Sequence, residues 1–97
     1  MQIIAMDKLK PGVSEERIGS YLLQEIKAGL VLYLQDKIRT FWFRQDGPGA
    51  VLMLECQSME EARSLVDSLP FVKEGIVDFD LIPIGPFSPL ALVVEKI

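Results

Sequence analysis

The stretch that decides the fold runs from Ile38 to Gln57 and reads IRTFWFRQ, then DGPG, then AVLMLECQ. Two runs rich in aromatic and branched residues flank the turn cluster 46–49, which is typical of a β-hairpin. The cluster contains two glycines and a proline, but it joins two strands and does not open a helix. It therefore predicts a turn and not a phosphate-binding loop.

The two faces of this hairpin differ in chemistry, because successive side chains of a strand point to opposite sides. One face is apolar and should lie under helices; it carries Phe41, Phe43, Leu52 and Leu54. The other face mixes apolar and ionisable side chains; it carries Ile38, Thr40, Trp42, Arg44, Met53 and Glu55. A water-exposed sheet favours small polar residues, so this mixed face predicts a covering partner chain or a ligand.

Length and composition indicate one domain over residues 1–97. A domain of this size buries only about 60–65% of its unfolded surface. The mean hydropathy of +0.28 indicates more apolar material than a small monomer easily hides. A homo-oligomer is the simplest explanation, and exposed apolar patches are the alternative.

Charge and residue usage exclude several functional classes. The net charge is −4 with no histidine and no basic stripe, which argues against a nucleic-acid partner. The longest apolar run, 28–34, is far shorter than the roughly 20 residues that span a bilayer, so no membrane association is expected. Cys56 is the one cysteine, and it is expected to be a buried, inert thiol. The sequence predicts a cytoplasmic protein with no metal site and no cofactor.

The rest of the chain predicts further elements around the hairpin. We expect strands over 2–9 and 76–84, a long helix from the N-cap Ser14 to about residue 35, a second helix from the capping box at Ser58 to about residue 68, a one-turn helix over 70–74, and a short helix over 89–95. The apolar stripe of the long helix comprises Ile18, Leu22, Ile26, Leu30 and Tyr33. The β-branched pair 93–94 leaves a strand open as the alternative for the last element.

The order of these elements is β-α-β-β-α-β, the α+β arrangement of ferredoxin-like folds. Both helices should then cover one face of a four-stranded antiparallel sheet and leave the other face open. Two such open faces packed together give a dimeric α/β barrel. This predicts a homodimer, with higher oligomers as a further option.

Part of the chain resembles the small proteins grouped with muconolactone isomerase. The resemblance runs from the hairpin to the fourth strand and is carried by R-x-D-x-PGAVL at 44–52, LEC at 54–56, EAR at 61–63, LP at 69–70, DF-x-LIP at 78–83 and PF at 86–87. It implies a dimeric α/β barrel. It also implies an activity in which a double bond of an unsaturated lactone is moved by proton transfer, without a cofactor.

The open face of the sheet holds the candidate site. We expect it to carry Ala5, Asp7, Thr40, Trp42, Arg44, Met53, Glu55, Asp78 and Asp80. A carboxylate shielded from water can act as a general acid or base, and Glu55 or Asp78 is the candidate base. Arg44 would hold an anionic substrate group by a two-pronged contact, and Trp42 would stack on a planar ring. Thr40, Met53 and Asp80 complete the predicted substrate-binding set.

The leading functional hypothesis is cofactor-free isomerisation of a small, unsaturated, carboxylated metabolite in a pocket between the sheet and its covering elements. The alternative is a non-catalytic binding or assembly module in which the charged residues form ion pairs that set the dimer register. A pocket of several hundred Å³ that is lined by Arg44 and a carboxylate favours the enzyme, and a filled interior favours the module. A haem-handling oxygenase is a third class, and the lack of histidine counts against it.

Overall fold

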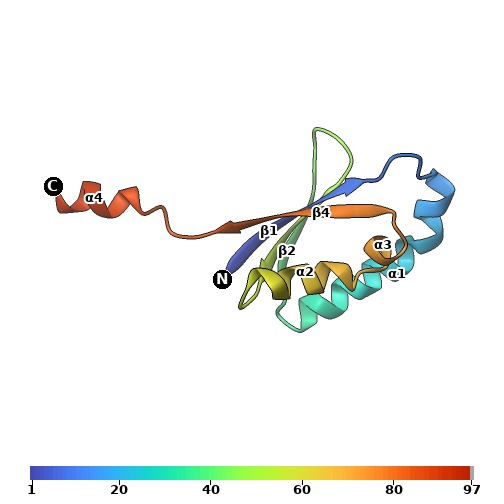
Figure 1. Ribbon diagram of the computed structural model, residues 1–97, viewed down its shortest axis with the longest axis horizontal. Helices are drawn as coiled ribbons and strands as arrows, with labels where there is room; N and C mark the ends of the chain where they lie inside the picture. The colour runs from blue at the N-terminus through green and yellow to red at the C-terminus, as the bar shows by residue number, and fades with distance from the viewer. Residues whose placement is uncertain (97) are drawn as a thin grey trace.

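The computed structural model describes residues 1–96 and shows the elements in the predicted order (Figure 1). The elements are β1 (Gln2–Leu9), α1 (Glu15–Leu34), β2 (Ile38–Phe43), β3 (Ala50–Glu55), α2 (Met59–Asp67), α3 (Pro70–Lys73), β4 (Val77–Ile84) and α4 (Pro89–Glu95). The ferredoxin-like α+β fold is therefore confirmed. The last element is a helix and not a strand.

The four strands form one antiparallel sheet in the order β2-β3-β1-β4. Strand β1 is central, which explains why both of its faces are apolar. The hairpin closes where the backbone N–H of Arg44 donates to the carbonyl of Gly49 at 2.9 Å. Gly49 has φ +131°, a conformation that L side chains rarely adopt, so the turn requires glycine there.

Side-chain caps fix where the two main helices begin. The Ser14 hydroxyl accepts from the backbone N–H of Arg17 at 3.1 Å, and the Ser58 hydroxyl accepts from that of Glu61 at 3.1 Å. The Glu61 carboxylate in turn accepts from the backbone N–H of Gln57 at 2.8 Å and pairs with Lys37 at 2.9 Å. The predicted caps therefore fix the first turns of α1 and α2.

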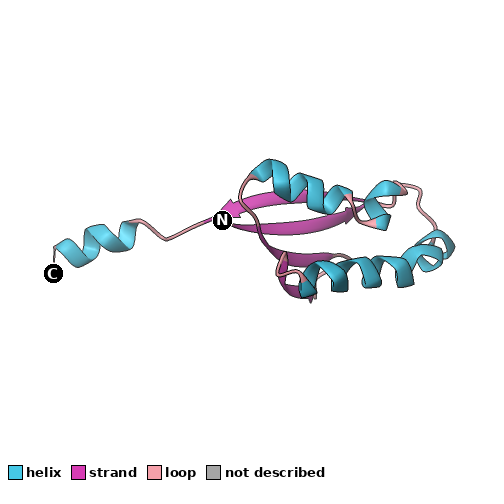
Figure 2. Ribbon diagram, turned by 90° about the horizontal axis from the view of Figure 1, so that it is seen from below, coloured by secondary structure: helices cyan, strands magenta, loops and turns pink. Residues whose placement is uncertain are grey.

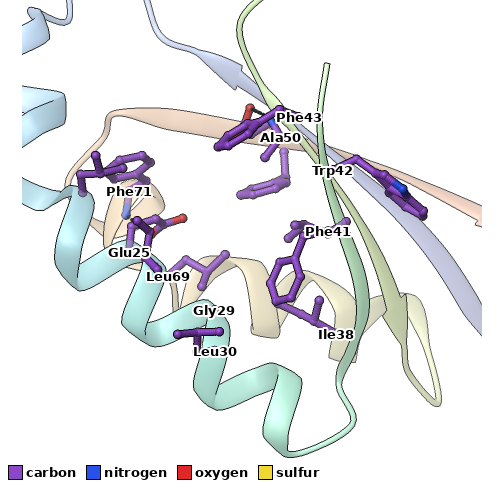
Figure 3. Close-up of a pocket in the computed structure, with 15 residues that line it drawn as sticks. Glu25, Gly29, Leu30, Ile38, Phe41, Trp42, Phe43, Ala50, Leu69 and Phe71 are labelled. Atoms are coloured by element: carbon purple, nitrogen blue, oxygen red, sulfur yellow. Dashed lines mark hydrogen bonds between the residues drawn. The ribbon is translucent and has the colours of Figure 1, made fainter. Parts of the chain in front are cut away.

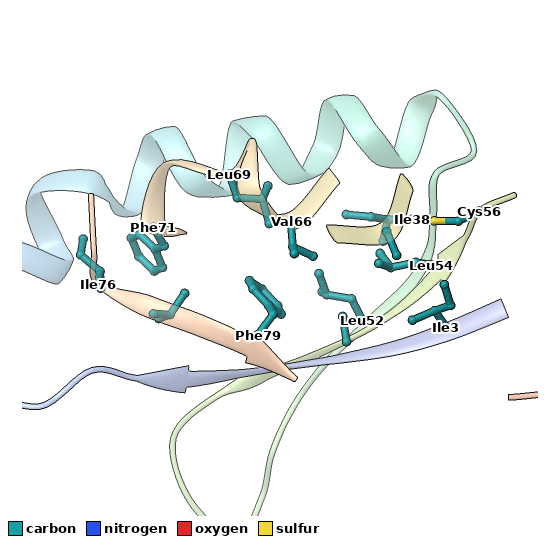
Figure 4. Packing of buried hydrophobic residues seen from close by; sticks show 13 residues of the cluster. Ile3, Ile38, Leu52, Leu54, Cys56, Val66, Leu69, Phe71, Ile76 and Phe79 are labelled. Carbon is teal, nitrogen blue, oxygen red and sulfur yellow. The ribbon is translucent and has the colours of Figure 1, made fainter. Parts of the chain in front are cut away.

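All the helices of the globular body lie on one face of the sheet, which we call the helix face (Figures 1 and 2). The buried core sits between this face and α2 and α3 (Figure 4). It comprises Ile3, Ala5, Ile38, Leu52, Leu54, Cys56, Ala62, Val66, Leu69, Phe71, Ile76, Val77 and Phe79. Cys56 is buried, as predicted, and burial raises the pKa of its thiol.

Three residues lie on the face opposite to the predicted one. Ala5 is fully buried in the core, and Asp7 shares its face, because β1 turns Ile3, Ala5 and Asp7 toward the helices. Ile38 is also buried, because a register irregularity between Ile38 and Thr40 breaks the alternation of β2. The prediction that these residues line the open face was wrong.

The other face of the sheet, the open face, carries an apolar belt that the register defines. One row across the sheet is Trp42, Val51, Met6 and Asp80; the next is Thr40, Met53, Ile4 and Ile82; the third is Glu55, Gln2 and Ile84. Trp42, Ile82 and Ile84 each remain at least 40% exposed. The mixed chemistry predicted for this face is present, with its apolar residues in the middle.

The C-terminal part of the chain leaves the body. After β4 ends at Ile84, the segment 85–88 and helix α4 extend away from the sheet and the other helices (Figures 1 and 2). We call residues 85–95 the arm. It gives the molecule its elongated outline of 58 × 29 × 19 Å. None of the described helices is long and apolar enough to cross a membrane.

The face assignment predicts unequal effects for two leucines. Leu54 is 1% exposed in the core, whereas Leu23 on α1 is 79% exposed. Leu54→Ala should lower the free energy of unfolding by about 2–5 kcal/mol because it leaves a cavity. Leu23→Ala should change it by less than about 0.5 kcal/mol. Urea unfolding followed by circular dichroism measures both, and equal losses would contradict the assigned core.

Candidate functional site

The charged residues predicted for substrate binding, Arg44 and Asp80, each form an ion pair with another residue on the surface. Arg44 donates to Asp46 through Nε at 2.9 Å and through a terminal nitrogen at 3.0 Å. Asp80 pairs with Lys8 at 3.0 Å. These ion pairs match the alternative in which charged side chains set local structure.

The candidate base Asp78 has a similar environment. Its carboxylate lies 3.8 Å from the Lys10 ammonium, and its side chain is 65% exposed. Glu55 differs, because one of its carboxylate oxygens is shielded from solvent without a hydrogen-bond donor in the described residues. The nearest charge to that oxygen is the chain's N-terminal ammonium at 3.9 Å. Glu55, Thr40, Trp42 and Met53 share the open face, and of these only Trp42 also lines the cavity described next.

A cavity of about 480 Å³ lies instead on the helix face, between α1 and the sheet. Figure 3 shows Phe41 and Phe43 directed toward it, with Trp42 between them pointing away. Its lining is apolar except for two carboxyl groups, and comprises Asp7, Leu22, Glu25, Ile26, Gly29, Leu30, Ile38, Phe41, Trp42, Phe43, Ala50, Leu52, Leu69, Phe71 and Phe79. We call this space the acidic cavity.

The cavity exists because α1 does not pack tightly against the sheet. No residue of Glu15–Leu34 is fully buried. The predicted stripe of α1 faces the sheet across the empty space, so that Leu22, Ile26 and Leu30 are each about half exposed. At Gly29 the helix comes near β2, since a Cβ there would lie in ordinary van der Waals contact with the Phe41 ring at 3.7 Å. The end of α1 is held by Tyr33, whose ring centroid is 5.5 Å from that of Phe41.

Asp7 enters the cavity from the central strand. Its Oδ1 accepts from the backbone N–H of Ala50 at 2.8 Å, which ties it to the start of β3. Gly49 packs against the same group, since a Cβ at Gly49 would lie 3.0 Å from Asp7 Oδ1. Burial raises the pKa of Asp7 above its ordinary value of 3.8, and the hydrogen bond from Ala50 only partly opposes this. The hairpin turn thus also positions a carboxyl group.

Glu25 enters the cavity from α1 (Figure 3). Its Oε1 accepts from the backbone N–H of Phe71 at 2.9 Å, a donor that the first turn of α3 leaves free. Burial raises the pKa of Glu25 above 4.5, and the nearby charge of Asp7 raises it further. The negative charge of Asp7 thus makes a smaller contribution to the raised pKa of Glu25 than burial does.

The arrangement suits proton transfer in an apolar setting. Among the described residues, those lining the cavity include no Lys or Arg. No group of three or more His, Cys, Asp or Glu side chains that could hold a metal ion occurs in residues 1–96. The chemical resources of the cavity are two carboxyl groups, several aromatic rings and an otherwise apolar lining.

Glu25 was missed in the sequence, although a signal for it exists there. It falls on the apolar stripe of the long helix, at the spacing that relates Ile18, Leu22, Glu25 and Gly29. A carboxylate on such a stripe must be either paired or functional. Asp7 was recognised as a candidate but assigned to the wrong face.

The raised pKa values predict a specific pH dependence of stability. Between the ordinary and the raised pKa, Asp7 and Glu25 bind more protons in the folded state than in the unfolded state. Their contribution is therefore fully present below the ordinary pKa and is lost as pH rises through the folded pKa. The double variant Asp7→Asn/Glu25→Gln keeps both acceptor oxygens, so its stability relative to the unmodified chain should increase as pH rises through that window.

Urea unfolding at a series of pH values from strongly acidic, below 3.8, to neutral measures this difference. Asp46→Asn is a matched control, because Arg44 lowers the pKa of Asp46 and so gives the opposite sign. The stability that Asp46 contributes is present above its ordinary pKa and is lost as pH falls. A double variant whose stability tracks that of the unmodified chain at every pH would contradict the assigned environment.

Comparison with known proteins places the fold. No protein-family model matches the chain, and no curated protein matches it. Among solved structures it is similar to 5-chloro-2-hydroxyhydroquinone dehydrochlorinase (TftG) from Burkholderia phenoliruptrix AC1100, determined in complex with 2,5-dihydroxybenzoquinone. The TM-score is 0.73 at 20% identity, over 92% of this chain and 98% of that chain. At this identity the similarity establishes that the two chains share a fold.

Proposed function

We propose that the protein is a small enzyme that transfers protons on a planar, unsaturated small molecule bound in the acidic cavity, without a cofactor. The observation that carries this proposal is the placement of two carboxyl groups, Asp7 and Glu25, in an otherwise apolar space of about 480 Å³. Cavities of roughly 300–1,000 Å³ with a few polar groups are typical of small-molecule sites. The solved structure of similar fold, TftG, is a dehydrochlorinase in complex with a one-ring quinone, which is consistent with a substrate of this size.

The proposed step is an isomerisation with balanced protons. The ionised member of the pair, which we assign to Asp7, removes a proton from a carbon next to an unsaturated carbonyl group. The protonated member, Glu25, whose pKa the charge of Asp7 raises further, delivers a proton to the far end of the resulting dienolate. The double bond moves and the substrate gains no net proton. The pair is left with its proton on Asp7 and is reset by exchange with water.

The charge of the cavity favours an uncharged substrate. The two carboxyl groups would repel a carboxylated ligand, and the nearby cation Arg44 is already paired with Asp46. The substrate proposed here is therefore uncharged, unlike the carboxylated metabolite expected from the sequence, and the reaction is still a proton transfer. Phe41 and Phe43 offer ring faces and edges to a planar molecule.

Two ligand pairs test this selectivity. Hydroquinone and its carboxylated counterpart 2,5-dihydroxybenzoate have the same ring, and an unsaturated γ-lactone can be compared with its carboxymethyl derivative. A ligand at tenfold its Kd stabilises the native state by about 1.4 kcal/mol, which raises the Tm by several degrees. We expect this shift with the uncharged member of each pair only. A larger shift with the carboxylated member would contradict the proposed substrate charge.

The carboxyl pair predicts how activity responds to substitution. With an uncharged lactone that shows turnover, Asp7→Asn and Glu25→Gln should each lower kcat about 10²–10⁴-fold, because each removes one proton-transfer group. Both variants keep the oxygen that accepts the backbone N–H. Their circular dichroism spectra should match that of the unmodified chain, so a loss of turnover would not reflect misfolding.

Glu55→Gln and Asp78→Asn serve as controls in the same assay, because these residues lie on the open face. Full turnover in these two variants supports the cavity. A loss confined to Glu55→Gln or Asp78→Asn would return the chemistry to the open face. A chain that binds ligands in the cavity without turning any over would instead be the non-catalytic binding module.

The cytoplasmic location stays a prediction.

We also infer that the chain forms a homodimer through the open face. The apolar belt of that face has Ile4, Met6 and Met53 in its middle rows and remains uncovered by any described helix. Ion pairs flank the belt, including Lys8–Asp80. A self-complementary apolar surface with a charged rim is typical of a two-fold interface.

A charge placed in the belt tests the dimer. Met53→Lys should weaken self-association at least about tenfold, the equivalent of 1.4 kcal/mol, because it buries an unpaired ammonium. Gln24→Lys on the exposed side of α1 introduces the same charge outside the interface and should leave association unchanged. Light scattering across a concentration series measures both, and the single Trp42 reports burial of the belt by its emission. A monomeric unmodified chain would contradict the inference.

A further inference from the structure

The arm, residues 85–95, has no role in the body of its own chain. Every residue of the arm is exposed, and α4 has no buried residue. The arm is nevertheless apolar, with Phe87, Leu90, Leu92 and Val94 each more than half exposed. Figures 1 and 2 show it projecting from the end of β4, clear of the sheet and the other helices. Exposed apolar side chains on this scale indicate that the arm contacts something else.

A second uncovered apolar surface borders the acidic cavity. Phe43 is 77% exposed at its mouth, and Leu30 and Phe41 are also exposed there. The polar groups inside, Asp7 and Glu25, are already partly buried in the single chain, and burial raises their pKa values. The cavity therefore lacks a cover, and its rim offers the apolar contacts that a cover would need.

The arm does not lie over the cavity of its own chain. Ile84 pairs with Gln2 at the start of β1, whereas Asp7 lies near the other end of that strand. The arm also points away from the body at that place (Figure 1). Residues 85–88 span at most about 14 Å and α4 adds about 10 Å, which is long enough to reach over a neighbouring molecule.

We propose that the arm of one chain seats its α4 over the mouth of the acidic cavity of a second copy, so that each site is completed by its partner. The stoichiometry supports a second copy, since every chain carries one arm and one uncovered rim, and exchange buries both. The arm follows directly after β4, whose Ile82 and Ile84 lie on the open face. It therefore begins beside the inferred dimer interface. Leu90, Leu92 and Val94 of the partner would then exclude water from the substrate. This inference rests on the dimer proposed above.

A membrane surface is a less suitable occupant. Helices that lie on membranes usually carry Lys or Arg along their polar side. The sequence has no basic residue from Glu74 to Glu95. The arm therefore lacks the charges that would hold it to anionic headgroups.

Contacts between chains can be measured directly by paramagnetic broadening. A nitroxide is attached at Leu92→Cys in a chain that also carries Cys56→Ala, so that the label has one site. This spin-labelled chain, at natural isotope abundance, is mixed with the ¹⁵N-labelled Cys56→Ala chain. The two are then allowed to exchange subunits. We expect the backbone signals of Leu30, Phe41 and Phe43 in the ¹⁵N chain to lose intensity, and to recover when the nitroxide is reduced with ascorbate.

Each other outcome overturns the proposal. Broadening centred on Met53 would place the arm on the open face, and no broadening in a sample that light scattering shows to be dimeric would leave the arm unseated. A monomeric sample would remove the partner, and arm-dependent sedimentation with phosphatidylcholine vesicles in place of broadening would assign the arm to membranes. These results do not depend on catalysis, so they remain distinct from a failure of the proposed function.

A shortened chain links the arm to the site. A chain ending at Gly85 keeps Asp7, Glu25 and the whole sheet, and it should bind hydroquinone about tenfold more weakly than the full chain while remaining folded. Equal affinity would contradict the covering role of the arm. If neither chain binds hydroquinone, the proposed substrate class fails, and the broadening experiment still decides where the arm lies.

Discussion

The hydrogen bond from the Ala50 backbone to Asp7 is the contact on which the site depends. It fixes a carboxyl group of the central strand at the point where the hairpin begins its return, at 2.8 Å from its donor. The backbone of Asp7 pairs with Phe79 of β4, and its side chain is tied to the start of β3 by this hydrogen bond. The carboxyl group stays in an apolar space, and burial raises its pKa. Glu25 then adds a second carboxyl group from the facing helix.

The two faces of the sheet have different roles. On the helix face, α2 and α3 complete the core, while α1 stands off and leaves the acidic cavity. On the open face, the apolar belt has no cover within the chain and supports self-association. The similarity to TftG concerns the fold, and the substrate and reaction proposed here are argued from the cavity itself. The arm would connect the two faces by carrying one chain to the site of another.

Much of the fold could be predicted from the sequence, because its signals are local. The turn cluster at 46–49, the caps Ser14 and Ser58, and the apolar runs each act within a few residues. The face assignment failed in β1 because both sides of this strand are apolar, so alternation does not show which side is buried. Its one carboxylate, Asp7, was therefore assigned to the open face. It failed again at Ile38, because a strand irregularity reverses parity and leaves no mark in composition. The cavity depends on how closely α1 approaches the sheet, which no local pattern encodes.

The most direct test of the account is a carboxyl titration by ¹³C NMR, in which the side-chain carbons of Asp7 and Glu25 are followed across pH. We expect both carboxyl groups to titrate above their ordinary pKa values of 3.8 and 4.5. The pKa of Glu25 should fall when Asp7 is replaced by Asn. Ordinary values for both groups, with no response of Glu25 to that replacement, would contradict it.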